Sequence, residues 1–251
     1  MAKLLRFEFH KLIRQKSFYI CLAVAVAMLV VSTCTTYLLN KDVMDTAEMG
    51  IDAMNVMIGS ASGGVLSMVI GVFIPLFACE DYVSGTIRNI ITRGYSRLAI
   101  FSAKLIAVML ATAVMTIACM AAGYLIGLIF SGSGVEPFDA ATVKILLCQL
   151  AVMLAEGALF YAISTVLQKT GGSIAVCLVL PMVLTIVLTL ADTALAEKDI
   201  SLSAYWLERI SGTLSSFDVK SADMKKALLT ALGYFVVTSA GSFLAVMKRE
   251  Y

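Results

Sequence analysis

The segment 78-ACEDYVSGTIRNIITRGYSR-97 separates two long apolar stretches and carries five charged residues. The flanking stretches 59–79 and 98–130 contain a single charged residue between them, Lys104. Long apolar runs that alternate with short polar connectors are typical of helical membrane proteins. The segment is therefore predicted to lie in water between two membrane spans. It is either a simple connector or a surface that receives a partner.

The composition also indicates a membrane protein. Hydrophobic residues make up 60% of the 251 residues and charged residues only 14%. Soluble domains contain roughly 45–50% apolar and about 25% charged residues. The expected fold is an all-α polytopic membrane protein with one transmembrane domain and six spans. The predicted spans are 17–39, 59–79, 98–130, 141–167, 172–191 and 226–247.

Lysine and arginine residues collect in alternate polar segments. Five lie in the segment 1–16 and three arginines lie in 80–97, whereas the connector 131–140 has acids only. Cytoplasmic loops of membrane proteins carry the excess of basic residues. We therefore expect both termini and the segment 80–97 in the cytoplasm, and the loop 192–225 outside.

The sequence lacks the motifs of several function classes. It has no Gly-x-x-x-x-Gly-Lys-Ser/Thr loop for a nucleotide phosphate and no His-Glu-x-x-His zinc motif. The six cysteines lie in predicted spans and form no Cys-x-x-Cys pair, and His10 is the only histidine. The chain is therefore not expected to be an enzyme, to hold a metal ion or to bind nucleic acid.

Two polar residues, Gln149 and Glu156, lie inside a predicted span, two turns apart. A carboxylate within a membrane is costly and indicates a functional site, unless it only joins helices. An ion-coupled carrier could use Glu156, but such a carrier would be expected to show more acids or matching broken helices in two halves. Both readings of Glu156 stay open.

Small residues recur at a spacing of four in two predicted spans. Such ridges let helices approach closely in a membrane. The predicted helix-packing residues are Gly59, Gly63, Ser67, Gly71, Gly123 and Gly127.

Two amphipathic segments flank the spans. The first, 1–16, is predicted to be an elbow helix in the cytoplasmic interface, with its apolar side in the lipid and its basic residues toward the headgroups. The second, 200–220, includes Tyr205, Trp206 and Leu207 and is too apolar for a free loop. It either lies on the outer leaflet as an interfacial segment or packs on the spans as a folded cap.

The segment 80–97 itself has a helical pattern. Ile87, Ile90 and Ile91 recur at i, i+3 and i+4, and polar residues occupy the other face. Ser84 is a suitable N-cap and Gly94 a suitable stop, while Ser96 can cap the next helix. The pattern predicts a short helix between two spans, which a plain linker would not need.

At these residues the chain resembles a known family. Glu80, 84-SGTI-87, 94-GYSR-97 and Lys104 are similar to the permeases of type-2 ATP-binding-cassette exporters, the ABC-2 family. The basic start 11-KLIRQKSFYI-20 and the six-span layout are similar as well. The resemblance implies a permease that pairs with a second permease chain, as a homodimer or heterodimer. It also implies separate ATPase subunits that hold ATP and Mg, so that this chain carries no cofactor.

The resemblance further implies that 80–97 is the coupling helix that docks on the ATPase. The residues expected to take part in coupling are Glu80, Asp81, Ser84, Gly85, Thr86, Arg88, Asn89, Arg93, Gly94 and Arg97.

The small size of the chain is similar to bacterial exporters of lantibiotics and bacitracin-type antibiotics. This likeness implies a bacterial cytoplasmic membrane protein for an amphipathic or peptide substrate, in antibiotic export or self-immunity. An ion-coupled carrier and a non-transporting membrane anchor or sensor subunit are the alternatives.

Overall fold

The computed structural model describes residues 2–47, 53–62, 64–130, 140–195, 201–215 and 221–247. Six helices in these ranges are long and apolar enough to cross a membrane, which confirms the all-α polytopic fold. They are α2 (Lys16–Ala47), α4 (Gly64–Val83), α6 (Arg97–Phe130), α7 (Ala140–Leu167), α8 (Thr170–Ala194) and α10 (Ser221–Met247). The shorter helices are α1 (Ala2–Arg14), α3 (Ala53–Ser62), α5 (Thr86–Thr92) and α9 (Leu207–Leu214), with a 3-10 turn at Ser203–Tyr205.

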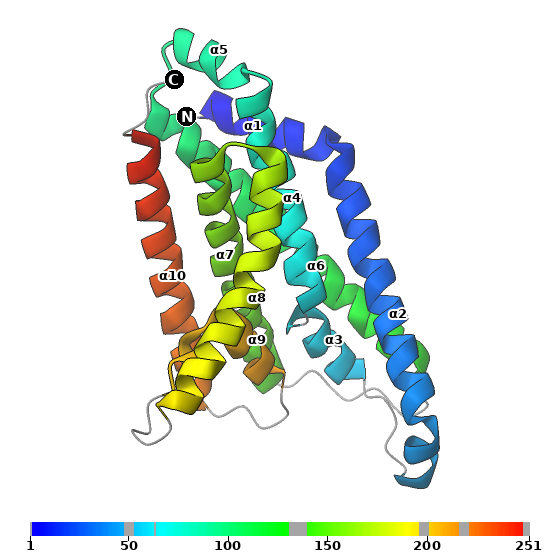
Figure 1. Ribbon diagram of the computed structural model, residues 1–251. Coiled ribbons are helices and arrows are strands. Elements are labelled where there is room, and N and C mark those ends of the chain that lie inside the picture. The colour runs from blue at the N-terminus through cyan, green and yellow to red at the C-terminus, as the bar shows by residue number, and fades with distance from the viewer. Residues whose placement is uncertain are drawn as a thin grey trace.

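The short helices lie at two opposite ends of the bundle (Figure 1). Helices α1 and α5 lie at one end, together with the last turn of α10. Helices α3 and α9 lie at the other end. We call these the α5 end and the α9 end. The segment 80–97 and the apolar segment after α8 are thus on opposite sides of the membrane-spanning region.

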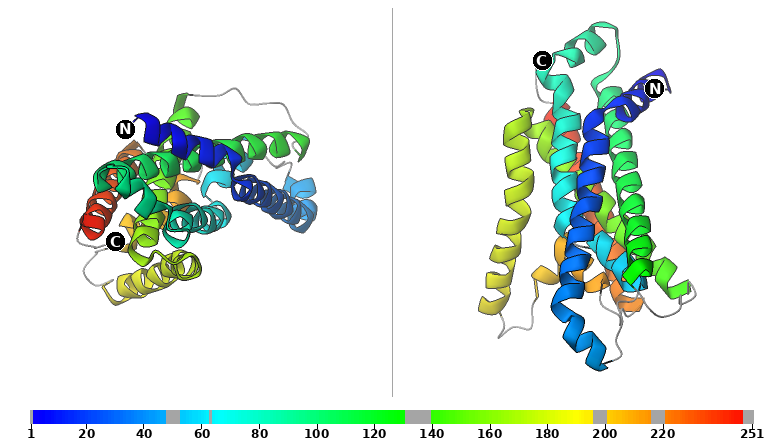
Figure 2. Two further views of the ribbon diagram at one scale, coloured as in Figure 1. Left: turned by 90° about the horizontal axis from the view of Figure 1, so that it is seen from above. Right: turned by 90° about the vertical axis from the view of Figure 1, so that its right-hand side faces the viewer.

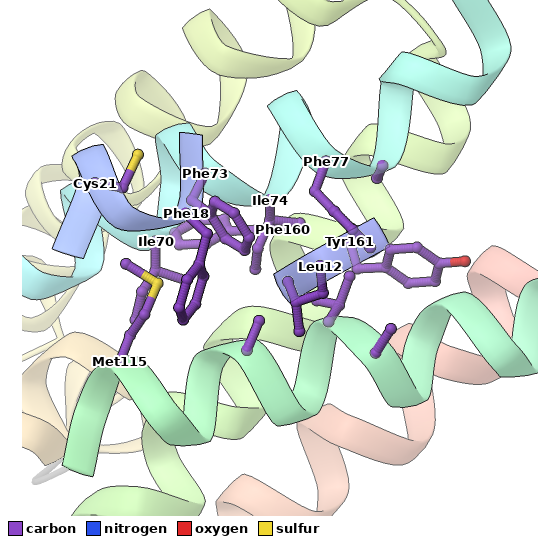
Figure 3. Packing of buried hydrophobic residues seen from close by; sticks show 14 of the residues in the cluster. Leu12, Phe18, Cys21, Ile70, Phe73, Ile74, Phe77, Met115, Phe160 and Tyr161 are labelled. Carbon is purple, nitrogen blue, oxygen red and sulfur yellow. The ribbon is translucent and has the colours of Figure 1, made fainter. Parts of the chain in front are cut away.

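Helix α4 is the centre of the bundle. It contacts α2, α6, α7 and α8, and Figure 2 shows it between α2 and α8. In the most apolar stretch of each helix, 67% of α4 is buried inside the protein, compared with 11% of α8. The outer helices, such as α8, are therefore left to face lipid. Its side chains Phe73, Ile74 and Phe77 pack against Phe160 and Tyr161 of α7 (Figure 3). A helix that is apolar all round is expected at such a central position.

The second predicted span, 59–79, includes the end of α3 and most of α4. Helix α3 ends at Ser62 and α4 begins at Gly64. The hydroxyl groups of Ser60 and Ser62 donate to the carbonyls of Met57 and Gly59 within α3. Gly59 lies on α3, whereas Ser67 and Gly71 lie on α4. Gly63 lies outside the described residues.

Helix α3 packs closely on α6. A Cβ atom at Gly127 would lie 2.5 Å from Ala53 Cα, and one at Gly123 would lie 2.8 Å from Ser60 Cβ. Both separations are too short for a real contact, so the missing side chains allow the two backbones to approach. On α4, Gly71 fits against Phe160 of α7 and Cys177 of α8.

Of the two alternatives for the apolar segment before the last span, the structure supports the folded cap. Leu207, Ile210 and Leu214 of α9 are buried against α7 and α10. Their spacing of three and four residues puts them on one helix face. Trp206 is also buried, while Tyr205 is exposed. The helix is held by apolar packing on the bundle instead of by the lipid surface.

We expect Gly127→Ala to lower the free energy of unfolding by about 1–3 kcal/mol, because its methyl group would overlap the backbone of α3. The control is Gly233→Ala on α10, where a Cβ would meet nothing within 4 Å. Thermal unfolding in detergent measures both variants. Equal unfolding temperatures for the two variants would contradict the close α3–α6 contact.

Candidate functional site

Helix α5 joins α4 to α6 and has a glycine with positive φ on each side. Gly85 precedes it with a φ of 68° and Gly94 follows it with a φ of 86°, a conformation that favours glycine. Gly85 is the N-cap, with no side-chain hydrogen bond, and Ser84 instead bonds through its hydroxyl to that of Thr86 at 2.8 Å. The expectation that Ser84 caps α5 was therefore wrong. Ser96 Oγ accepts the backbone N–H of Ala99, which confirms Ser96 as a cap of α6.

The apolar side of α5 faces the bundle. Ile87 is buried, and Ile90 and Ile91 are half-buried in a cluster with Leu4 of α1 and Ile100 of α6. Asn89, Thr92 and Arg93 are exposed on the other side. The side chain of Arg88 lies outside the described part of the chain. Helix α5 thus rests on two other helices and presents a polar side away from them.

A carboxylate at the end of α4 holds two lysines from two other helices. Asp81 Oδ1 lies 2.6 Å from Lys11 Nζ of α1. The other oxygen of Asp81 is paired with Lys104 Nζ of α6, which also donates to the carbonyl of Ala78 at 3.3 Å. Asp81 is 4% exposed and Lys104 is 1% exposed. Buried charges must be paired in this way, so Asp81 joins α1, α4 and α6 immediately beside α5.

Lys11 also contacts Glu80. The side chain of Lys11 points in a different direction from the one predicted from the sequence. Its Nζ lies 3.0 Å from Glu80 Oε2, and Gln15 donates to the same oxygen. Burial opposes the charge on Lys11, but hydrogen bonds and attraction from Asp81 and Glu80 outweigh burial and raise the pKa of Lys11. The basic residues of the elbow helix were expected to point toward lipid headgroups. Lys11 instead points into the bundle, because two carboxylates lie there.

Glu8 is a buried acid beside this network. It is 0% exposed, and neither carboxylate oxygen has a hydrogen-bond partner among the described residues. Burial raises the pKa of Glu8, Lys104 and Lys11 lower it, and Asp81 raises it; the net effect is a raised pKa. The protonated form of Glu8 is therefore favoured in the folded chain.

Sequence reasoning missed the partners of this network. Asp81 and Lys11 are 70 residues apart, so no local pattern connects them. One signal was present, because Lys104 lies two turns inside an apolar helix and such a cation needs an acidic partner. Glu8 gave no comparable signal, since it lies among charged residues in 3-KLLRFEFHKL-12.

The polar residues of α7 belong to the α9 end of the bundle. Gln149 donates to the carbonyl of Ile58 on α3 at 3.0 Å, and Glu156 accepts a hydrogen bond from Ser67 of α4. Neither residue contacts the Asp81 network. A further acid near them, Glu208 of α9, was missed, although its position among apolar residues in 205-YWLERI-210 was a signal.

The α5 end can therefore bind and transmit a movement. Asn89 and Arg93 are exposed, and Arg97 begins α6 directly after the α5 turn. A movement of α5 would be transmitted to α4 and α6 through the covalent chain. It would be transmitted to α1 through the ion pair between Asp81 and Lys11. The geometry of 80–97 thus suits contact with another protein.

We expect the free energy of unfolding of the wild-type chain to fall as the pH rises above 4.5, the ordinary pKa of a glutamate carboxyl group. This fall is measured relative to the Glu8→Gln variant, which has no carboxyl group at this position. The folded state keeps a proton that the unfolded state has lost, so the difference grows by up to about 1.4 kcal/mol per pH unit until the raised folded pKa is passed. Thermal unfolding in detergent across this range measures the difference. Asp223→Asn, at an exposed acid, is the control, and a pH-independent difference for Glu8→Gln would contradict the burial of its carboxyl group.

Comparison with known proteins identifies the family. A family model described as ABC-2 family transporter protein matches residues 4–192, which include most of α1, the whole of α5 and the Asp81 network. A search of curated proteins found no match. The match covers about three quarters of the chain, and the six spans and the polar helix between the second and third agree with a transporter of this kind. The chain therefore belongs to the ABC-2 family of transporter proteins.

Proposed function

We propose that the chain is the permease subunit of an ATP-driven exporter and that α5 docks on a separate ATPase subunit. The observation that carries this proposal is the position of α5. Its polar side is exposed, and its apolar side is fixed to the helices that Asp81 joins. The sequence has no motif for nucleotide binding, so the energy for transport would come from the partner.

A groove between α1 and α5 supports the docking of a partner. It has a volume of about 340 Å³ and combines apolar side chains, such as Leu4 and Phe7, with the basic residues Lys3 and Arg93. Such a surface suits a partner that presents an apolar side chain with acidic neighbours. The proposed contact residues are those of the segment 80–97 that are exposed, together with the start of α1.

The charge distribution supports a cytoplasmic α5 end. Lys3, Arg6, Arg14 and Arg93 are all exposed there. Because cytoplasmic segments carry the excess of basic residues, we propose that both termini and α5 lie inside the cell, where ATP is available. The cap helix α9 would face the outside.

The mechanism follows from the connections of α5. Closure of two ATPase subunits on ATP would move the two docked α5 helices, and each would carry α4 and α6 with it. This movement would open a path between two permease chains toward the outside. An amphipathic or peptide substrate, in bacterial antibiotic export or self-immunity, is the substrate class that we propose.

We expect the double variant Asn89→Asp with Arg93→Glu to weaken ATPase binding at least about tenfold, because it reverses the charge of the exposed side of α5. The measurement is co-purification of a co-expressed ABC ATPase subunit, together with ATP-dependent transport in vesicles. The matched control is Arg14→Glu, at an exposed basic residue of α1 outside the groove.

Unchanged ATPase binding and transport in the double variant would contradict docking through α5. Transport by the chain without any ATPase, abolished by Glu156→Gln, would instead indicate an ion-coupled carrier.

A further inference from the structure

The α9 end contains a second polar cluster, which the coupling function does not use. It consists of Ser67 of α4, Glu156 of α7, Thr185 of α8 and Glu208 of α9. Trp206, directly before α9, reaches the same cluster. Glu156 is buried and Glu208 is half-buried, and an isolated charge within a largely apolar bundle is costly.

Glu208 attaches the cap to a spanning helix. Thr185 Oγ1 donates to Glu208 Oε2 at 2.7 Å, and the same hydroxyl accepts the indole N–H of Trp206 at 2.9 Å. Trp206 is 5% exposed, so its ring is buried while these bonds are formed. Trp206 and Glu208 therefore share Thr185 as a hydrogen-bond partner, and the same hydroxyl also lies 2.9 Å from the carbonyl of Pro181.

Glu156 and Glu208 lie along one side of α4. Ser67 donates to Glu156, and a Cβ at Gly64, one turn before Ser67, would lie 3.8 Å from Glu208 Oε1. Residues three apart on a helix are neighbours on its surface. The two carboxyl groups are close enough for the charge of Glu208 to act on Glu156.

Charged groups of the neighbouring helices are directed elsewhere in the described chain. Asp192 of α8 accepts the backbone N–H groups of Leu202 and Ser203, Lys226 of α10 lies over the ring of Tyr205, and Lys144 of α7 is exposed. Arg209 is exposed and acts on Asp192, and α3 has no ionisable side chain. No described cation thus compensates the two acids, and a second negative charge would repel the first.

Two further buried groups extend the cluster toward the outer ends of α7 and α9. Gln149 lies two turns before Glu156 on α7, and Ser211 lies one turn after Glu208 on α9. Gln149 Oε1 and Ser211 Oγ are buried and have no hydrogen-bond partner among the described residues.

We propose that Glu156 binds a proton beside Glu208, and that this proton, together with the apolar packing of Leu207, Ile210 and Leu214, holds the cap helix α9 on the bundle. With one proton, the pair carries a single negative charge and Glu208 keeps its bond to Thr185. Loss of the proton puts two negative charges beside each other. Glu156 is fixed on a long spanning helix, whereas Glu208 is on an eight-residue cap helix, so the repulsion displaces α9 and releases Trp206. The pair is then a pH-sensitive switch of the outer end, and it requires no ATPase.

The test uses Trp206, which is the only tryptophan of the chain. The chain is reconstituted in lipid nanodiscs, and tryptophan emission and acrylamide quenching are followed from about pH 5 to about pH 9.5, a range that includes displaced carboxyl titrations. We expect the wild-type emission to shift to longer wavelength and the quenching to increase as the pH rises. Glu156→Gln and Glu208→Gln should each keep the buried, low-pH signal throughout.

The control variant is Asp223→Asn, which removes an exposed acid of α10 at the same end and should titrate like the wild type. Equal emission of all variants at low pH establishes that they are folded. A wild-type signal that does not change with pH overturns the proposal, whatever the variants do. A pH-dependent shift that persists in either amide variant also overturns it.

Discussion

The structure depends on the pairing of one carboxylate, Asp81, with two lysines from different helices. Lys104 and Asp81 are almost completely buried, so neither charge could be left there alone. Loss of one partner of a buried pair costs about 3–5 kcal/mol, because the other charge remains without compensation. This constraint fixes the ends of α1, α4 and α6 relative to one another. Helix α5 lies directly beside them, and its position is therefore fixed as well.

The two polar clusters of the bundle have different kinds of partner. At the α5 end, cations match acids, and the remaining polar side of α5 is free to contact another protein. At the α9 end, Glu156 and Glu208 bond to neutral hydroxyl groups, and no described cation pairs with them. The first arrangement joins three helices by paired charges, whereas we propose that the second changes with protonation. A transporter that opens outward needs both a rigid connection to its energy source and a releasable outer closure.

The sequence predicted the elements that follow from local patterns. The apolar runs gave the six spans, and the isoleucine spacing with Gly94 gave α5. Helix α3 was missed because the apolar run through 59–79 does not reveal a break. The partners of Lys11 and the approach of Glu208 to Glu156 were missed because they depend on how distant helices pack, which residue spacing along the chain does not record.

The central claim is that α1 and α5 move as one unit. Spin labels at His10 of α1 and at Leu98, an exposed residue of α6 directly after the α5 turn and outside the proposed contact surface, test it directly, with the distance measured by double electron–electron resonance in a complex with an ATPase subunit. The account predicts the same His10–Leu98 distance within one chain with and without trapped ATP, and a changed distance between the two Leu98 labels of paired permeases. A distance within one chain that changes as much as the distance between chains would contradict it.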